Sequence, residues 1–596
     1  MLYHDSHDAK YRVPVGPVPA GGTLCLRFLC DEGENVTLRT WNGEERRISM
    51  TAIGGGLFEA SITVPGEPTL LWYDFIIHRA NGDARYGTSC DQLGGVGAYS
   101  YNQPHSYQVT VYDPAYMTPA FLRHGIVYQI FPDRFLRDKN GIKGRARRVR
   151  ETHPEATFHA EWDEEPALDI DPESGDNRAL DFFGGTLRGI KQKLGYLQEL
   201  GVSILYLNPV FRARSNHRYD TGSYEEIDPI LGDSAAFDEL LAAAKAHGMH
   251  VMMDGVFSHT GADSQYFNRY GRYPTLGAYQ SEASPYASWY HFDHFPDRYS
   301  TWWGFATLPA VNKENEAYRH YLLNPENGVL PRWVHHGACG WRLDVADELP
   351  MPLLRDMRKA VKGADSQAVL LGEVWEDASN KIAYGQQRSY CLGDTLDSVM
   401  NYPLRRAVID FFTGVIDAFH LRRVILHQRE VYPAPFYYAL MNLLGSHDRV
   451  RILNAMTGYD RVGIVQMDRA EAHEVKLSKR ELKSAKKKYL EALKLLCALP
   501  GAPTLYYGDE IGMTGMADPW NRAPMDWNGE DERLREEIAK LLRARAGTAV
   551  LQTGYLDIEA LDEDTLKVRR FALDGKDVFG EALGEKPVAV RISRRL

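Results

Sequence analysis

From Gly125 to Tyr507, short apolar runs of strand length alternate with amphipathic stretches of helix length. This alternation is typical of βα units on a parallel sheet, because two parallel strands need a crossover, usually a helix, between them. Eight such units are the number that closes a (β/α)₈ barrel, the TIM-barrel fold. The eight apolar runs are Ile126–Phe131, Ser203–Leu207, His250–Asp254, Gly340–Asp344, Ala368–Gly372, Ser398–Met400, Leu440–Leu444 and Pro503–Tyr507.

The segment between the first two runs predicts one helix over Leu187 to Leu200. Ile190, Leu194 and Leu197 fall on one face of this helix, and Gly201 stands where a left-handed C-cap is expected. We therefore expect the helix to pack its apolar face on the barrel strands.

The remaining sequence predicts a multidomain chain. Residues 1–118 read as short alternating strands between Gly and Pro, typical of an antiparallel β-sandwich, and two long inserts interrupt the barrel pattern at Asp138–Asp181 and Thr260–Tyr318. We predict an N-terminal β-sandwich at 1–118 and a barrel at 119–258 and 320–540. We also predict an inserted subdomain at 259–319 and a small C-terminal β-domain at 541–596. The clearest sandwich strands are Thr23–Phe28, Asn35–Arg39 and Leu70–Ile77, and the C-terminal ones are Thr565–Val568 and Val588–Ile592.

Composition excludes several classes of partner. With 80 acidic against 69 basic residues, the net charge of −11 repels phosphate backbones and anionic lipid, so neither nucleic acid nor a membrane is an expected partner. No run of about 18 apolar residues occurs and residues 1–16 lack an apolar leader segment, so we expect a cytoplasmic protein. The six cysteines are scattered without metal-binding spacing, and no organic cofactor or metal ligand set is expected.

Carboxylates stand at the ends of the predicted barrel strands. Strand alternation turns Arg342 and Asp344 to the same side, into the barrel, and the guanidinium is expected to keep the carboxylate of Asp344 charged. Glu373 follows the fifth run among Gly and apolar residues, a dry setting that favours a protonated carboxyl. One charged and one protonated carboxyl are what glycosidic cleavage requires.

Further polar residues follow the third and seventh runs. Asp254 ends the third run with His259 five residues later, and His447 and Asp448 follow the seventh. Each alone is more often structural than catalytic. Together they lie on the carboxyl-end rim where barrel enzymes place their active sites, which favours a shared catalytic role.

At these residues the sequence resembles the α-amylase family, glycoside hydrolase family 13, and within it the neopullulanase, cyclomaltodextrinase and amylopullulanase-like members. Four motifs occur in the family's order: Asp254-Gly-Val-Phe-Ser-His259, Gly340-Trp-Arg-Leu-Asp344-Val-Ala-Asp-Glu348, Gly372-Glu-Val-Trp375 and Ser446-His-Asp448. The resemblance covers about residues 120 to 530.

The resemblance implies a role for each motif residue. Asp344 would be the nucleophile, Glu373 the proton donor, and Asp448 would bind sugar hydroxyls in the transition state. The implied substrate-binding residues are His259, Arg342, His447, Tyr219, Asp254, Asp518 and Arg522, with Asp254 in a supporting role. The implied substrate is an α-linked glucan, cleaved at α-1,4 or α-1,6 bonds by double displacement with retained configuration.

Departures from the family pattern leave some properties open. Ser258 replaces an Asn that binds calcium in many members, so a structural calcium ion is not supported at the usual site; the acidic stretch around Asp169, Asp171 and Asp176 is another conceivable place. Ala310 and Asp347 also depart from the pattern near the acceptor side, which leaves bond preference and the balance of hydrolysis and transfer open.

Three alternatives remain at the level of sequence. The same site could belong to an α-glucan transferase, or the chain could be an inactive carbohydrate-binding homologue. A barrel metallohydrolase is less compatible, because the first run, Tyr128-Gln-Ile-Phe-Pro132, lacks the His-x-His pair that such barrels use. The resemblance implies that the barrel is the catalytic domain and that the N-terminal sandwich is of the carbohydrate-binding or dimerisation type, which suggests a homodimer.

Overall fold

The computed structural model describes residues 2–30, 35–80, 82–138, 142–171, 177–460, 469–529 and 531–595. Its central sheet has eight parallel strands in the order β28-β25-β24-β19-β16-β13-β30-β29, and a bridge between Met400 and Met441 joins the two outermost strands. The predicted TIM barrel is therefore confirmed. Its strands are β13 (Val127–Ile130), β16 (Ile204–Leu207), β19 (His250–Gly255), β24 (Gly340–Leu343), β25 (Val369–Gly372), β28 (Ser398–Val399), β29 (Met441–Leu443) and β30 (Ala502–Tyr506).

The barrel interior is filled by every second residue of these strands. At one level it is apolar, with Val127, Ile204, Met252 and Leu371 packed in one buried cluster. Two residues further along each strand, toward its carboxyl end, the inward positions become polar. These are Gln129, Tyr206, Asp254 and Glu373, all buried. Because successive strand residues alternate between faces, this change from apolar to polar places the chemistry at the carboxyl-end rim.

The outward-facing residues of the strands, such as Trp341 and Leu343, pack against surrounding helices. The predicted helix from Leu187 to Leu200 is wrong in one respect, because it is divided into two helices at Lys193, where φ is −104° and ψ is 7°. Gly201 caps the second in the left-handed conformation at φ 91°, as expected. The principal helices are α4 (Leu187–Gln192), α5 (Leu194–Leu200), α6 (Ser234–Ala246), α8 (Val329–His335), α9 (Met351–Ala364), α10 (Tyr402–Phe412), α11 (Ala418–Val431), α15 (Lys479–Ala498) and α16 (Glu532–Ala546).

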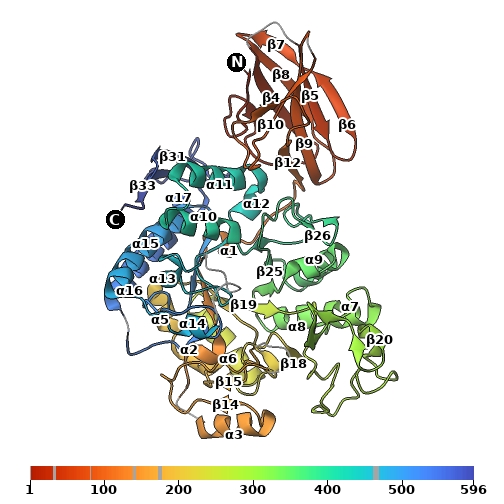
Figure 1. The fold of residues 1–596 in the computed structure, drawn as a ribbon, viewed down its shortest axis with the longest axis vertical. Coiled ribbons are helices and arrows are strands. Elements are labelled where there is room, and N and C mark those ends of the chain that lie inside the picture. The colour runs from red at the N-terminus through yellow and green to blue at the C-terminus, as the bar shows by residue number, and fades with distance from the viewer. Residues whose placement is uncertain are drawn as a thin grey trace.

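The N-terminal region forms two β-sheets around a core of its own, at one end of the molecule (Figure 1). Within these sheets all pairings are antiparallel except that of β3 (Val18–Pro19) with β12 (Tyr107–Tyr112). The predicted β-sandwich is confirmed. Its other strands are β1 (Leu2–Tyr3), β2 (Arg12–Val13), β4 (Thr23–Cys30), β5 (Asn35–Trp41), β6 (Glu45–Ser49), β7 (Thr51–Gly54), β8 (Leu57–Thr63), β9 (Thr69–His78), β10 (Ala84–Gly87) and β11 (Ala98–Ser100).

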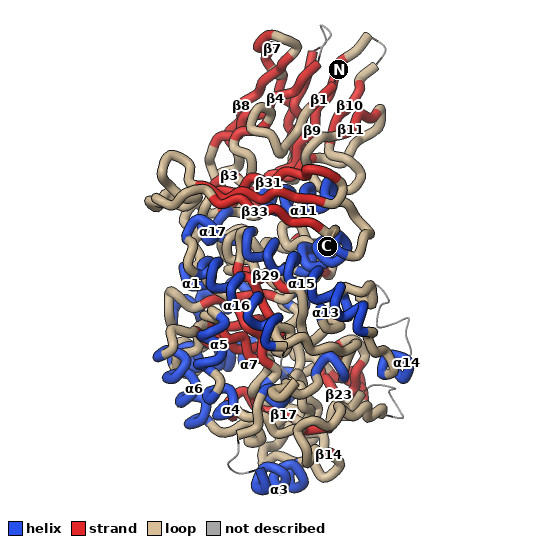
Figure 2. Tube along the Cα trace, turned by 90° about the vertical axis from the view of Figure 1, so that its left-hand side faces the viewer, coloured by secondary structure: helices blue, strands red, loops and turns tan. Residues whose placement is uncertain are grey.

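The C-terminal part forms an antiparallel sheet of β31 (Tyr555–Asp562), β32 (Thr565–Phe571) and β33 (Val588–Ser593). Figure 2 shows this sheet between the sandwich and the barrel, beside helix α11. The exact boundaries of the four predicted parts stay predictions. In the described ranges, no helix combines the length and the apolar character needed to cross a membrane.

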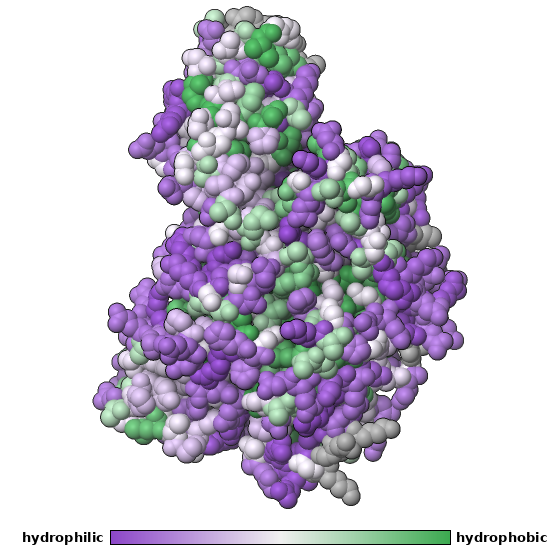
Figure 3. Space-filling view, turned by 180° about the vertical axis from the view of Figure 1, so that it is seen from behind, coloured by the Kyte–Doolittle hydropathy of each residue, from purple (hydrophilic) through white to green (hydrophobic). Residues whose placement is uncertain are grey.

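Both inserts rise from barrel strands. The first, after β13, contains α3 (Ile142–Thr152), β14 (Thr157–Phe158) and β15 (Asp181–Phe182). The second, after β19, contains η1 (Ala287–Trp289), β20 (Phe292–His294), β21 (Arg298–Tyr299), β22 (Thr301–Trp302), β23 (Phe305–Pro309) and α7 (Glu316–Leu323). A shorter excursion after β25 carries β26 (Ile382–Ala383) and β27 (Gln386–Gln387). Seen from behind, the surface is mostly hydrophilic, with hydrophobic residues gathered on the sandwich and near the middle of the body (Figure 3).

Candidate active site

One guanidinium, that of Arg342 on β24, joins three carboxyl groups. Its Nη1 lies 2.8 Å from Asp254 Oδ1 and 2.8 Å from Asp344 Oδ1, and its Nη2 lies 2.8 Å from Glu373 Oε2. These acids stand at the carboxyl ends of the neighbouring strands β19, β24 and β25. The structure therefore brings three of the predicted acidic site residues together around the buried guanidinium of a fourth predicted site residue, Arg342.

A chain of hydrogen bonds continues from Asp254 to His447. Asp254 Oδ2 accepts from the hydroxyls of Tyr206 at 2.6 Å and Tyr219 at 2.8 Å, and Tyr219 lies 2.6 Å from His447 Nε2. Gln129 Nε2 lies 2.8 Å from His447 Nδ1, and burial and nearby arginines lower the pKa of His447 well below its usual value. The neutral ring therefore accepts from Gln129 and carries its proton on Nε2.

Glu373 is buried, as predicted, but its neighbours in space are polar rather than apolar. Besides its contact with Arg342, Glu373 accepts hydrogen bonds from Trp375 Nε1 at 3.0 Å and from the backbone N–H of Val345 at 2.9 Å. The apolar neighbours in sequence did not reveal these donors, because Arg342 and Val345 come from the adjacent strand β24 and the turn that follows it. Glu373 is thus buried in a polar environment.

Asp448 lies beside His447, with Oδ1 3.2 Å from His447 Nε2 and 3.9 Å from Arg522 Nη2. Arg522 Nη1 in turn lies 3.1 Å from Asp518 Oδ1, and Arg522 Nε donates to the backbone carbonyl of His447 at 3.0 Å. These contacts join the loops after β29 and β30. They place Arg522 between Asp448 and Asp518.

Several buried polar atoms near these groups have no hydrogen-bond partner within the described part of the chain, among them His259 Nε2, Trp302 Nε1 and Asp448 Oδ2. The rings of His259 and Trp302 lie 5.1 Å apart, and His259 Nδ1 lies 2.9 Å from the hydroxyl of Ser258. Leaving buried polar atoms unpaired costs free energy, so they are candidates to bind the hydroxyl groups of a ligand.

Burial controls the electrostatics of the site. It raises the pKa of Asp344 well above its ordinary value, with Arg342 opposing and the charge of Glu373 adding to the rise. One guanidinium is shared by three acids, and the expectation that Arg342 keeps Asp344 charged stays a prediction. Burial also raises the pKa of Asp448 to about 7 and lowers that of His259 to about 3. Burial therefore favours the protonated form of Asp344 and Asp448, whereas the guanidinium of Arg342 favours their charged form.

The raised pKa of Asp448 predicts an effect on stability. Between about pH 4, where an unfolded aspartate ionises, and about pH 7, where Asp448 ionises in the fold, rising pH favours the unfolded chain. Replacing Asp448 with Asn removes this penalty. We expect the Asn variant to melt at a higher temperature than the wild type at pH 8, with the difference vanishing near pH 4; scanning calorimetry at both pH values measures it. A constant difference across pH would contradict this account.

Sequence reasoning missed three polar residues of the site: Gln129, Tyr206 and Asn208. Asn208 Nδ2 donates to the Tyr219 hydroxyl at 2.9 Å, and Gln129 Nε2 donates to Asn208 Oδ1 at 3.1 Å. Each lies on the inward side of an apolar run or directly after it. Counting every second residue toward the carboxyl end of each predicted strand would have found them.

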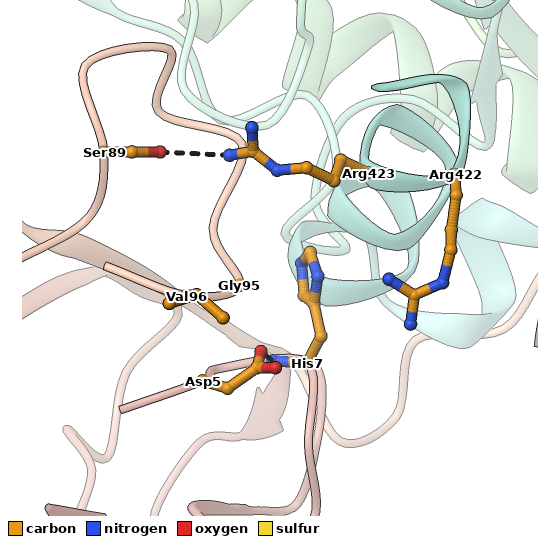
Figure 4. A pocket seen from close by; sticks show the side chains of 7 residues that line it. All are labelled: Asp5, His7, Ser89, Gly95, Val96, Arg422 and Arg423. Carbon is orange, nitrogen blue, oxygen red and sulfur yellow. Dashed lines mark hydrogen bonds between the residues drawn. The ribbon is translucent and has the colours of Figure 1, made fainter. Parts of the chain in front are cut away.

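A cavity of about 300 Å³ lies elsewhere, between the N-terminal sandwich and helix α11 (Figure 4). Its charged groups already have protein partners, because Arg423 pairs with Asp91 and His7 with Glu430. None of the predicted site residues lines it. Its lining residues are Asp5, His7, Ser89, Gly95, Val96, Arg422 and Arg423.

Whether the protein binds a structural calcium ion stays a prediction. In the described ranges, no group of three or more His, Cys, Asp or Glu side chains is arranged to hold a metal ion. Asp169 pairs with Arg178, whereas Asp176 lies outside the described residues.

Comparison with known proteins identifies the family. The family model described as the catalytic domain of alpha amylase matches residues 129–540. An amylopullulanase of Thermoanaerobacter thermohydrosulfuricus is 35% identical over 646 residues, covering 100% of this chain but 42% of that protein. The chain thus spans less than half the length of this relative. Neopullulanase 2 of Thermoactinomyces vulgaris is 31% identical over 81% of this chain and 72% of its own length.

Solved structures give the same result. The cyclic alpha-maltosyl-(1→6)-maltose hydrolase of Arthrobacter globiformis has a TM-score of 0.63 and 30% identity, over 77% of this chain and 90% of that one. A cyclomaltodextrinase has a TM-score of 0.64 and 26% identity, over 96% of this chain and 88% of that one. The chain therefore belongs to the alpha-amylase family of glycoside hydrolases.

Proposed function

We propose that this protein is a retaining α-glucan hydrolase that cleaves α-1,4, and also α-1,6, glucosidic bonds. Its substrates are maltooligosaccharides, cyclodextrins, pullulan or starch. The observation that carries the proposal is the convergence of Asp254, Asp344 and Glu373 on Arg342, at the rim of a barrel of this family. Relatives named amylopullulanase, neopullulanase and cyclomaltodextrinase support the class of substrate.

The proposed reaction is a double displacement. Glu373 protonates the glycosidic oxygen while Asp344 attacks the anomeric carbon, so that the C–O bond breaks and a covalent glucosyl-enzyme forms. Glu373, now a carboxylate, takes a proton from water, and that water releases the sugar with retained configuration. The carboxyl groups of Asp344 and Glu373 are expected to lie roughly 5 to 5.5 Å apart, as in other retaining enzymes.

The remaining groups bind the sugar. Asp448 and the unpaired Nε2 of His259 are available for its hydroxyls, while Arg342 fixes the orientation of both reacting carboxyls. Tyr219 contributes a ring that is parallel to that of His447, with 5.3 Å between the ring centroids. His447, whose Nε2 lies 2.6 Å from the Tyr219 hydroxyl, is neutral and so adds no charge to the site.

Product analysis tests the proposal. The enzyme is incubated with starch, β-cyclodextrin and pullulan, and the first products are followed by NMR. We expect short maltooligosaccharides that appear first as the α-anomer. The proposal would be overturned if none of the three substrates released sugar, or if the first products had the β-configuration. Pullulan products also separate α-1,4 from α-1,6 cleavage.

Two finer properties are proposals of the same kind. The N-terminal sandwich suggests a homodimer, which sedimentation or light scattering tests. A cytoplasmic location is the expectation from composition. The alternatives of a transferase or an inactive homologue are outcomes of the product analysis.

A further inference from the structure

The loop after β25 begins with Glu373 and is fixed again four residues later, at Asp377. Asp377 Oδ2 lies 2.8 Å from His427 Nε2, and Asp377 Oδ1 accepts from the Tyr432 hydroxyl at 2.9 Å. The same hydroxyl accepts from the backbone N–H of Ala378 at 3.0 Å. His427 lies on helix α11 and Tyr432 directly follows it, so the loop that carries Glu373 is attached to this helix.

The contact between Asp377 and His427 is a charged one. Burial raises the pKa of Asp377, but hydrogen bonds from His427 and Ser379 outweigh this effect and bring the pKa to about 2. Burial lowers the pKa of His427, but the carboxylate of Asp377 outweighs this effect in turn and leaves the pKa of His427 above its ordinary value. A hydrogen bond between charged groups is stronger than a neutral one, so Asp377 anchors the loop more firmly than an uncharged side chain would.

Trp375 lies midway between Glu373 and Asp377. Its Nε1 donates to Glu373 Oε1 at 3.0 Å, and its ring stacks on that of Tyr402 with 4.0 Å between the centroids and 4° between the planes. Trp375 is 39% exposed, so packing covers only part of it. Because one residue separates Trp375 from Asp377, a displacement of Asp377 moves the indole that holds the carboxyl of Glu373.

Helix α11 is in turn held by the N-terminal sandwich, which lies against it (Figure 1). Arg423 lies 2.6 Å from Asp91, and Glu430 lies 2.6 Å from Arg12, with both members of the second pair buried. Residues three and four apart share one face of a helix, so Arg423, His427 and Glu430 lie on the same face of α11. The face that binds the sandwich is therefore also the one that binds Asp377.

Strand β12 of the sandwich reaches the loop directly as well. Gln108 Oε1 accepts from Asn380 Nδ2 at 2.8 Å, and the Thr110 hydroxyl donates to the backbone carbonyl of Val431 at 2.6 Å. Asn380 belongs to the loop after β25, and Val431 ends α11. The sandwich thus contacts both the loop and the helix that anchors it.

We propose that Asp377 is a positioning residue for the general acid Glu373, and that the N-terminal sandwich keeps the loop in place through α11 and β12. This inference rests on the proposed function, in which Glu373 protonates the leaving oxygen. Proton transfer requires the donor within hydrogen-bond reach of that oxygen, so a small displacement of Glu373 slows it. Attack by Asp344, which follows strand β24, does not depend on this loop.

Two substrates with different leaving groups test the proposal. Hydrolysis of maltohexaose needs the proton of Glu373, whereas the first turnover of α-maltosyl fluoride does not. We expect Asp377→Ala and His427→Ala each to slow maltohexaose hydrolysis about 10-fold and fluoride release less than about 2-fold, the scale of a small misplacement of one catalytic group. His427→Gln keeps a donor near Asp377 and should recover most of the loss. Gln108→Ala should act in the same direction with a smaller effect.

His336→Gln is the matched control. It removes a histidine that lies 3.1 Å from Asp238 at the ends of other barrel helices, and its ratio of the two rates should equal that of the wild type. Equal slowing of both substrates in Asp377→Ala, or wild-type rates on both, would overturn the positioning role. If Asp377→Ala does not fold, Asp377→Asn, which keeps the size of the side chain, decides by the same ratio.

A spectroscopic measurement separates this inference from the proposed function. An inactive wild-type enzyme would refute the proposed function alone. In protein labelled with ¹⁵N-tryptophan, the indole N–H resonance of Trp375, assigned with Trp375→Phe, should shift in Asp377→Ala and stay unchanged in His336→Gln. An unchanged resonance in Asp377→Ala would show that Asp377 does not position the indole on Glu373, whatever the activity.

Discussion

Replacing Asp344 with Asn is expected to lower kcat by at least ~10³ on every α-glucan that the enzyme cleaves, because the amide cannot form the covalent glucosyl-enzyme. The loss should be as large with α-maltosyl fluoride, since a good leaving group does not replace a nucleophile. Asn has nearly the same shape as Asp, and Arg342 keeps its contacts with Asp254 and Glu373, so the fold should survive. Initial rates over a range of substrate concentrations measure the effect.

Two further variants check the role of Asp344. In Asp344→Ala, azide can occupy the vacated space and attack the anomeric carbon, so part of the rate should return with a β-glucosyl azide as product. Asp356→Asn removes a carboxylate of helix α9 that pairs with Arg319 and Lys359 outside the site, and should change kcat little. Near-normal turnover in Asp344→Asn would remove the nucleophile assignment.

Replacing Glu373 with Gln is expected to lower kcat on glucans by at least ~10³ as well, for a different reason. The glycosidic oxygen then leaves without a proton. Fluoride needs no proton to leave, so the first turnover of α-maltosyl fluoride should be slowed far less than the hydrolysis of maltohexaose. Rapid-quench measurement of fluoride release separates the two.

The contrast between the two substrates distinguishes catalysis from structure. A merely structural role of Glu373, through its contacts with Arg342, Trp375 and Val345, would slow both substrates equally. In Glu373→Ala, azide should attack the glucosyl-enzyme and give an α-glucosyl azide, opposite in configuration to the product from Asp344→Ala. Equal losses of rate on both substrates would therefore contradict the assignment of Glu373 as the general acid.

The barrel could be predicted because its strands are buried on both faces and read as continuous apolar runs. The positions of Asp254, Asp344 and Glu373 followed for the same reason, since each stands where such a run ends. The break in the helix at Lys193 could not be predicted from apolar spacing, because the same face stays buried on both sides of it.

The contacts between residues distant in the chain were beyond sequence reasoning. Arg342 is two residues from Asp344, which suggested an ion pair between these two residues alone. Its contacts with Asp254 and Glu373 depend on how the neighbouring strands align. Asp377 is 50 residues from His427 and 55 from Tyr432. Nothing local indicates that this loop aspartate is held by a helix further along the chain.

The apolar layer inside the barrel limits how the leaving sugar and the incoming water can reach or leave the active site. The buried apolar cluster of Val127, Ile204, Met252 and Leu371 fills the barrel interior beneath the active-site residues, so substrate and water reach these residues from the carboxyl-end rim. The departing sugar and the incoming water must use the same opening. A slow departure of the sugar therefore delays the entry of water. The lifetime of the covalent intermediate then depends on the rim of the barrel as well as on the catalytic carboxylates.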